Sequence, residues 1–136
     1  MTDLDRVTTW FNLCPYLQTL AMYIDTTPDW PISAGLYPKG QVVLKETWDV
    51  TGQYKSRIRQ VYVLRCALQE GAEAARRLQQ IQNWVFTQNI NGATPGLGEK
   101  ETVQGMNGRL ERASQVGKSI YALTLTVEFE RISEGV

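Results

Sequence analysis

Histidine is missing from this sequence, and the absence of imidazole excludes many common reactions. Histidine is the most frequent general base, the usual partner of nucleophilic Ser and Cys, and a common zinc ligand. Net charge is missing as well, because 14 Lys and Arg are balanced by 14 Asp and Glu. Nucleic acid is held mainly by excess positive charge. We therefore expect neither an enzyme nor a dedicated nucleic-acid binder.

Features of exported and membrane proteins are also absent. No run of apolar residues approaches the roughly 18 of a membrane span. The first residues include Asp3 and Asp5, and no apolar segment follows them as it does in a secretory signal. Cys14 and Cys66 each lie in an apolar run, which favours buried free thiols over a disulfide. We expect a protein that stays in the cytosol where it is made and contacts no membrane.

The length of 136 residues suits one domain, and we expect a single domain over 1–136. Apolar residues at helical spacing predict helices over about 3–14 and from Gly71 to about residue 91. Alternating patterns predict a short strand at 20–25, a long hairpin at 41–69, an edge strand at 101–112 and a final strand at 121–130. This order predicts an α+β fold, a two-layer sandwich in which two helices pack on one face of a mostly antiparallel sheet.

Two rows of charged residues lie on the predicted strands. Alternation along the hairpin places Arg57 and Arg59 on the face opposite its apolar residues, and alternation along the final strand does the same for Glu128 and Glu130. Both rows fit a solvated sheet face. As an alternative, the basic row meets the acidic row, either across neighbouring strands of one sheet or on a neighbouring subunit.

The four tryptophans divide into two groups. Trp10, Trp48 and Trp84 fall within predicted helices and strands, so we expect them in the core. Trp30 lies between two prolines in a predicted loop, where a rigid aromatic side chain can anchor an interface. Trp30 is therefore the expected partner contact.

The sequence contains no complete phosphate-loop motif and no carboxylate spacing of a metal site. The segment 92–102 superficially suggests a phosphate loop, but Glu99 separates Gly98 from Lys100 and a helix precedes the segment where a strand is needed. The carboxylates are scattered, without the spacing of a metal site. We predict no catalytic residue, no cofactor site and no metal site.

Several short motifs occur together across most of the chain. They are the Asp25 arm leading into Ser33-Ala34-Gly35-Leu36-Tyr37-Pro38, the Asp49-Val50-Thr51-Gly52 turn followed by Tyr62-Val63-Leu64, the run Asn83-Trp84-Val85-Phe86-Thr87-Gln88, the loop Thr94-Pro95-Gly96-Leu97-Gly98, and the late strand Ile120-Tyr121-Ala122-Leu123. In this combination the chain resembles the small minor capsid or tail-terminator-like proteins of long-tailed bacteriophages and prophages, especially those of Gram-positive hosts.

The resemblance implies a structural virion protein and no enzyme. Its subunits would form a ring, commonly a hexamer, that caps the tail tube and offers the surface to which the head docks. Its partners would be copies of itself, the tail-tube protein and a head-completion or connector protein. DNA would only pass through the lumen. The protein would lie at the head-proximal end of the tail, and in the host cytoplasm during assembly.

Interface residues are expected in segments rich in Gly and Pro and in the charged rows. They are Trp30, Leu36 and Tyr37 in the arm from Trp30 to Gly40, Pro95 and Leu97 in the loop from Pro95 to Gly98, and Arg57, Arg59, Glu128 and Glu130 on the strands. A lumen that passes DNA avoids strong positive charge. We therefore expect the acidic row nearer the channel than the Arg57 row.

Three alternatives remain open from the residues alone. A head-side connector or stopper protein shares the size and the ring. A small-molecule-binding α+β domain would use the sheet face as a pocket and respond to ligand with a thermal shift. An enzyme built on carboxylates would lose its activity when one or two acidic residues become amides.

Overall fold

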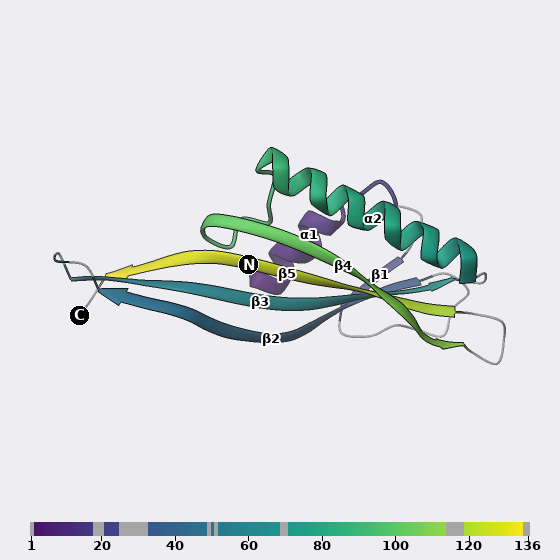
Figure 1. The fold of residues 1–136 in the computed structure, drawn as a ribbon, viewed down its shortest axis with the longest axis horizontal. Coiled ribbons are helices and arrows are strands. Elements are labelled where there is room, and N and C mark those ends of the chain that lie inside the picture. The colour runs from purple at the N-terminus through teal and green to yellow at the C-terminus, as the bar shows by residue number, and fades with distance from the viewer. Residues whose placement is uncertain are drawn as a thin grey trace.

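A five-stranded sheet carries two helices in the computed structural model of the chain (Figure 1). The elements in chain order are α1 (Asp3–Phe11), β1 (Ala21–Ile24), β2 (Ser33–Trp48), β3 (Gln53–Leu68), α2 (Gly71–Asn91), β4 (Glu99–Ala113) and β5 (Ser119–Glu134). The structure describes residues 2–17, 21–24, 33–48, 50, 52–68, 71–113 and 119–134. Trp30, the expected partner contact, lies outside the described residues.

The sheet has the strand order β1-β2-β3-β5-β4. Three of its pairings are antiparallel, and β1 alone runs parallel to its neighbour, pairing with residues 33–36 of β2. Both helices lie on the same side of the sheet (Figure 1). The predicted α+β fold is confirmed, and so is the edge position of the strand that begins near residue 101, because β4 is last in the order.

Helix α1 begins at a capping box. The Thr2 hydroxyl accepts a hydrogen bond from the Asp5 backbone N–H at 3.2 Å, and the Asp5 carboxylate accepts one from the Thr2 N–H at 3.0 Å. These bonds satisfy donors that a helix start leaves unpaired. The helix ends at Phe11, earlier than the predicted residue 14, because Pro15 disfavours helical backbone in the residue before it and lacks an N–H.

Helix α2 contributes Leu78, Ile81 and Val85 to the core, as its apolar spacing predicts. Trp84 packs beside this stripe, with its ring centre 4.8 Å from that of Trp10 on α1. The two helices therefore form one layer joined by aromatic contact as well as by the sheet beneath them. None of the helices in the described ranges is both long and apolar enough to cross a bilayer.

The strands show the predicted alternation where helices cover them. On β5, Val127 and Phe129 are buried in the core while Glu128 and Glu130 between them are partly exposed. On β3, Leu64 and its neighbours of even number point to the same core. The helix-facing side of these strands thus supplies the sheet half of the sandwich.

One end of the sheet extends beyond both helices, at the left of Figure 1. There β2 and β3 form the hairpin arm, which we define as residues 41–48, 50 and 52–57. Every described residue of the arm on the β2 side is exposed. The predicted strand with one buried face is wrong for this stretch, because no helix lies over it. A bulge between Val43 and Lys45 also interrupts the alternation.

The α2–β4 loop is held against the sheet by specific contacts. The Glu101 carboxylate accepts hydrogen bonds from the backbone N–H groups of Gly96 and Leu97, each at 2.8 Å. From α1, Arg6 and Trp10 donate to backbone carbonyls of the loop at 2.9 and 2.7 Å. The loop is therefore fixed from two sides, by β4 through Glu101 and by α1 through Arg6 and Trp10.

Gly98 should be indispensable at the end of this loop. A Cβ atom there would lie 2.4 Å from the Glu130 carbonyl oxygen and 2.7 Å from the Phe129 ring, both distances too short for real contacts. We expect Gly98→Ala to lower the free energy of unfolding by about 1–3 kcal/mol, the usual cost of overpacking. Urea unfolding followed by tryptophan fluorescence measures it. Gly105→Ala is the matched control, because its Cβ meets neighbours only at 3.4 Å or more. Equal losses in both variants would contradict the expectation.

Candidate interaction surfaces

The predicted charged rows lie beside each other on one face of the sheet. In the strand register, Arg59 stands opposite Glu128 and Arg57 opposite Glu130. Arg59 forms an ion pair with Glu128 at 3.5 Å, and Lys100 forms one with Glu130, also at 3.5 Å. Arg57 donates instead to the Lys100 carbonyl at 2.9 Å. Of the two arrangements left open by the sequence, the structure shows cross-strand pairing within the sheet.

This pairing changes what the rows can do. The pairs are partly exposed, so each contributes little to stability. Because the basic and acidic rows are adjacent on a single face, they cannot line different surfaces. That the acidic row lies nearer a channel than the Arg57 row stays a prediction, and the pairing means that the Arg57 row would lie directly beside it. The combined surface has alternating signs and little net field.

The hairpin arm presents apolar side chains to solvent. Trp48 is 67% exposed, which corrects its predicted place in the core. Its ring centre lies 4.9 Å from that of Tyr54, whose hydroxyl donates to the Glu46 carboxylate. The other exposed apolar residues of this end are Val42, Val43, Leu44 and Val50 on the arm and Ile132 on β5. Exposed clusters of this kind mark interaction sites.

The residues expected to make contacts in the Gly- and Pro-rich segments have different surroundings. Leu36 and Leu97 are buried in the core, so their side chains offer no surface. Tyr37 is half-buried, with the Arg65 guanidinium 4.5 Å above its ring centre. Pro95 is partly exposed in a shallow pocket beside α1. Of these four, Tyr37 and Pro95 are the ones with surface to offer.

A polar network that the sequence did not reveal joins α1 to the sheet. Arg131 donates from Nη2 to both carboxylate oxygens of Asp3 at 2.7 Å. Gln60 is buried, and its Nε2 donates to Asp3 at 2.8 Å and to Gln41 at 2.9 Å. The Tyr62 hydroxyl donates to the side-chain amide oxygen Oε1 of Gln60 at 2.5 Å. The network closes the end of the core where α1 begins and the hairpin arm starts.

Protonation equilibria reflect this network. Burial opposes ionisation of Asp3, but the hydrogen bonds from Arg131 and Gln60 and the nearby positive charges outweigh it, so its pKa lies below the usual value. Burial, together with the negative charge of Asp3, raises the pKa of Tyr62 to about 12. Asp3 is thus held ionised and Tyr62 neutral across the physiological range.

Two features of the described residues concern metal binding and thiol reactivity. Within the parts of the chain that the structure describes, no group of three or more His, Cys, Asp or Glu side chains is placed to hold a metal ion. Cys14 is a buried free thiol, and burial raises its pKa, which keeps it in the unreactive protonated form.

Comparison with known proteins adds little to this geometry. No protein-family model matches the chain, and no curated protein matches it. Among solved structures, a chain known only by a sequence identifier is similar with a TM-score of 0.42 and 12% identity, over 91% of this chain and 93% of that chain. A likeness this weak carries no argument about function.

Trp10 and Trp48 should respond differently to the same substitution. Trp10 is buried and donates to a loop carbonyl, so Trp10→Phe loses packing and a hydrogen bond, and we expect a loss of about 1–3 kcal/mol in the free energy of unfolding. Trp48→Phe should change it by less than about 0.5 kcal/mol. Urea unfolding at protein concentrations where light scattering shows monomers measures both. A comparable loss in Trp48→Phe would mean that the arm is packed within the monomer.

Ionisation of Asp3 should make the free energy of unfolding depend on pH in the acidic range. Because its pKa is lowered by folding, the ionised carboxylate stabilises the folded state above the unfolded pKa of about 3.9, and this contribution is lost as pH falls through the folded pKa. We expect Asp3→Asn to cost about 1–2 kcal/mol at pH 7, and the difference from the wild type to shrink below about pH 4. Urea unfolding across pH measures it, with Glu99→Gln as the exposed control. A pH-independent difference would refute the role of the charge.

Proposed function

We propose that the protein is a structural subunit of a bacteriophage tail terminator, which forms a ring at the head-proximal end of the tail tube. Head-side connector proteins are the second candidate of the same structural class. The sequence resemblance is the origin of the proposal. The observation that supports it best is the hairpin arm, a projection beyond the core that exposes Trp48 and other apolar side chains, in a chain whose charged residues balance.

In a single subunit, the arm leaves apolar side chains exposed to water. Trp48 stays 67% exposed and Val43 45% exposed, and each would gain free energy from further burial, roughly 25 cal/mol per Å² of apolar surface. Exposed apolar strands also risk aggregation unless a partner covers them. A subunit of a closed assembly resolves both problems, because a neighbour or the tail tube covers the arm.

The mechanism is geometric. A heterologous contact repeated by rotation closes into a ring of fixed number, and such a ring has two different faces. One face would stop growth of the tail tube, and the other would receive the head. The alternating charges of the Arg59 and Glu128 surface create no strong positive field, so a lumen that included this surface would let DNA pass without holding it.

Ring formation is the direct test. Light scattering over a concentration series should detect a species about six times the chain mass of 15.4 kDa, and negative-stain images should show closed rings. Trp48→Glu should abolish the large species by placing a charge in the arm. Leu13→Glu is the matched control, because Leu13 is similarly exposed at 68% but lies after α1, away from the arm.

The result that would contradict the proposal is a strict monomer, both alone and with purified phage tail tubes. A monomer that changes its melting temperature with a small molecule would favour a ligand-binding domain instead. If rings still form in Trp48→Glu, the proposed ring stands, but the hairpin arm is not part of the contact between subunits.

A further inference from the structure

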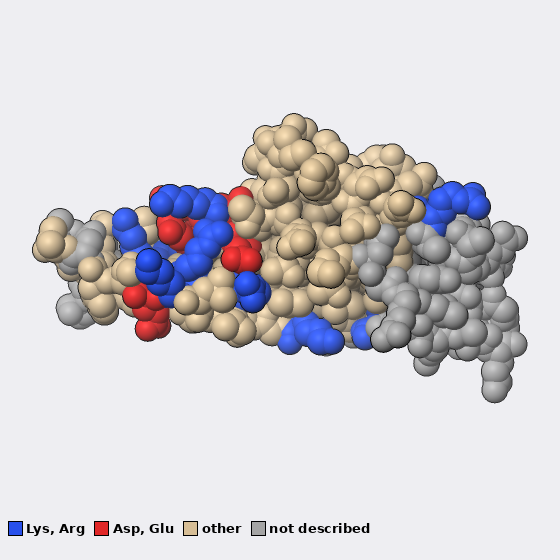
Figure 2. Space-filling view, viewed as in Figure 1, with Lys and Arg blue, Asp and Glu red and all other residues tan. Residues whose placement is uncertain are grey.

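From Leu78 onward the exposed side of α2 carries no charge, whereas Arg76 nearer the start of the helix is exposed. From Leu78 to Gly98 the sequence contains no Asp, Glu, Lys or Arg, although this stretch includes much of the helix surface. Phe86 and Ile90, one turn apart, are 64% and 66% exposed. Figure 2 shows charged side chains gathered over the extended end of the sheet, further basic side chains at the opposite end and along the lower border, and a central surface without charge between them. The cores of protein interfaces are depleted of charge and enriched in aromatic residues.

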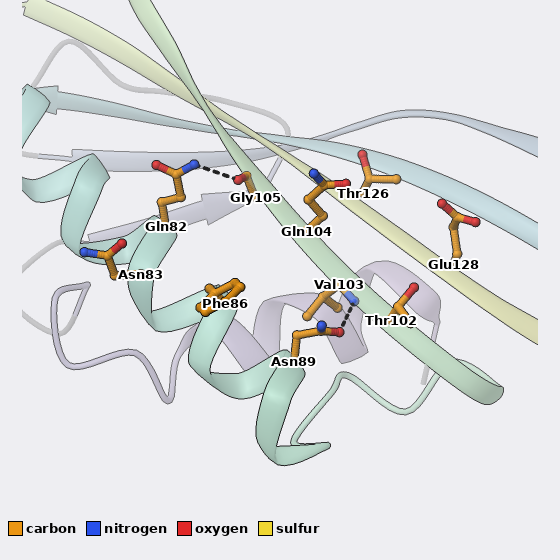
Figure 3. A pocket seen from close by; sticks show the side chains of 10 residues that line it. All are labelled: Gln82, Asn83, Phe86, Asn89, Thr102, Val103, Gln104, Gly105, Thr126 and Glu128. Atoms are coloured by element: carbon orange, nitrogen blue, oxygen red, sulfur yellow. Dashed lines mark hydrogen bonds between the residues drawn. The ribbon is translucent and has the colours of Figure 1, made fainter.

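A groove of about 520 Å³ runs between this helix and strand β4 (Figure 3). The Gln82 amide donates to the Gly105 carbonyl at 3.0 Å, and the Asn89 amide oxygen accepts from the Val103 N–H at 2.9 Å. Phe86 lies between these two amides along the helix. The groove is therefore a slot with apolar and amide walls, bordered by the backbone of a sheet edge.

The two amide contacts define the open edge of β4. In an antiparallel strand, the N–H and C=O of one residue point to the same side. The Val103 N–H and the Gly105 C=O face α2, so the Val103 C=O and the Gly105 N–H also point to the groove, away from β5. The Val103 C=O and the Gly105 N–H are spaced so that both can bond to the N–H and C=O of one residue on a strand added beside β4. The groove thus presents both apolar surface and backbone hydrogen-bonding groups.

The opposite edge of the sheet has a matching surface. Strand β1 pairs only with residues 33–36 of β2, so among the described strands residues 38–48 of β2 have no neighbour on their outer side. This open edge of β2 carries the exposed side chains of Val42, Val43 and Leu44. One molecule therefore has two different open edges, one with a groove and one with projecting apolar residues.

The groove and the open edge of β2 carry different charged groups. Glu128 is the one charged residue among those that line the groove, and its carboxylate is paired with Arg59 at 3.5 Å. The open edge of β2 carries Lys39 and Lys45, and its single carboxylate, Glu46, accepts a hydrogen bond from Tyr54. An approach of the β2 edge to the groove therefore brings lysines toward the partly exposed Glu128 carboxylate, whereas two β2 edges would bring lysines together.

From these observations we propose that the groove between α2 and β4 receives the open edge of β2 from a second copy of the chain. The contact is heterologous, because two different surfaces meet, and it can therefore repeat around a ring. This contact specifies which surfaces join the subunits of the proposed ring, and the closure of the ring rests on the proposed function. Val43 and Leu44 of one copy would cover Phe86 of the next, and the sheet would continue from β4 of one subunit to β2 of its neighbour.

Site-specific cross-linking tests the contact directly. One copy carries Phe86→Cys and an affinity tag, and the other carries Val43→Cys without a tag. A short bismaleimide should join the mixed pair at least tenfold more than Phe86→Cys or Val43→Cys copies alone. Mixtures of Leu13→Cys with either variant, and wild-type chains with buried Cys14, set the background. Preferential linkage of Phe86→Cys to itself would indicate a two-fold contact and overturn the proposal.

Charge placement gives a second, independent readout. Phe86→Glu should raise the concentration for half-assembly at least tenfold while the thermal melt of the monomer stays the same. Adding Val43→Lys to the same chain should recover most of that loss, because every heterologous contact then contains an opposite-charge pair. Leu13→Glu is the matched control for exposure. No recovery in the double variant, combined with no mixed cross-link, would overturn the contact.

The outcomes separate this inference from the proposed function. Rings that tolerate Phe86→Glu and give no mixed cross-link would retain the terminator proposal and reject this contact. Mixed cross-links in open filaments or dimers, with no closed ring, would retain the contact and reject the terminator proposal. Absence of both rings and mixed cross-links at every concentration would reject both.

Discussion

A mismatch of lengths between strands and helices governs this structure. Strand β2 has 16 residues and, at roughly 3.3 Å per residue, spans about 53 Å. Helix α2 has 21 residues but, at 1.5 Å per residue, spans only about 32 Å. The shorter helix α1 covers part of the remaining sheet beside α2 (Figure 1). The rest of the strands extends into solvent as the hairpin arm, so the molecule has a packed body and an uncovered end.

The boundary between these two parts is chemically defined. Asp3 at the start of α1 is held by Arg131 and by Gln60, and this polar network closes the core at the point where helical cover ends. Beyond it, Trp48 and Val43 face water. A core that ends in a satisfied polar network can stop there without leaving buried groups unpaired. The arm is thus free to serve another molecule without loss of the fold.

The second open surface follows from the same architecture. Because α2 packs along β4, it borders that edge of the sheet and leaves a groove there, with Gln82 and Asn89 bonded to the edge backbone. Two contacts occupy part of that edge, which limits indiscriminate strand pairing. A groove at one edge and an arm with exposed apolar side chains at the other give the subunit two different surfaces, which a heterologous contact that closes by rotation requires.

Much of the fold could be read directly from periodicity. The stripe Leu78, Ile81 and Val85 and the alternation of Val127 and Phe129 with Glu128 and Glu130 are local patterns, and they were confirmed because side-chain direction repeats with backbone geometry. The edge position of β4 also followed from its composition. The pairing of the charged rows could be listed as one of two arrangements, but only the strand register selects between them.

What the sequence by itself determined is the set of elements, the faces of its strands, and the absence of imidazole chemistry and net charge. Tertiary structure decided which faces are covered. Trp48 and Trp10 look alike in sequence, yet one is exposed and the other buried, because burial depends on an opposing layer and not on the pattern of its own strand or helix. The Asp3–Arg131 contact joins residues from opposite ends of the chain. Such a contact exists only once α1 packs on the sheet, since no local pattern encodes the distance between them.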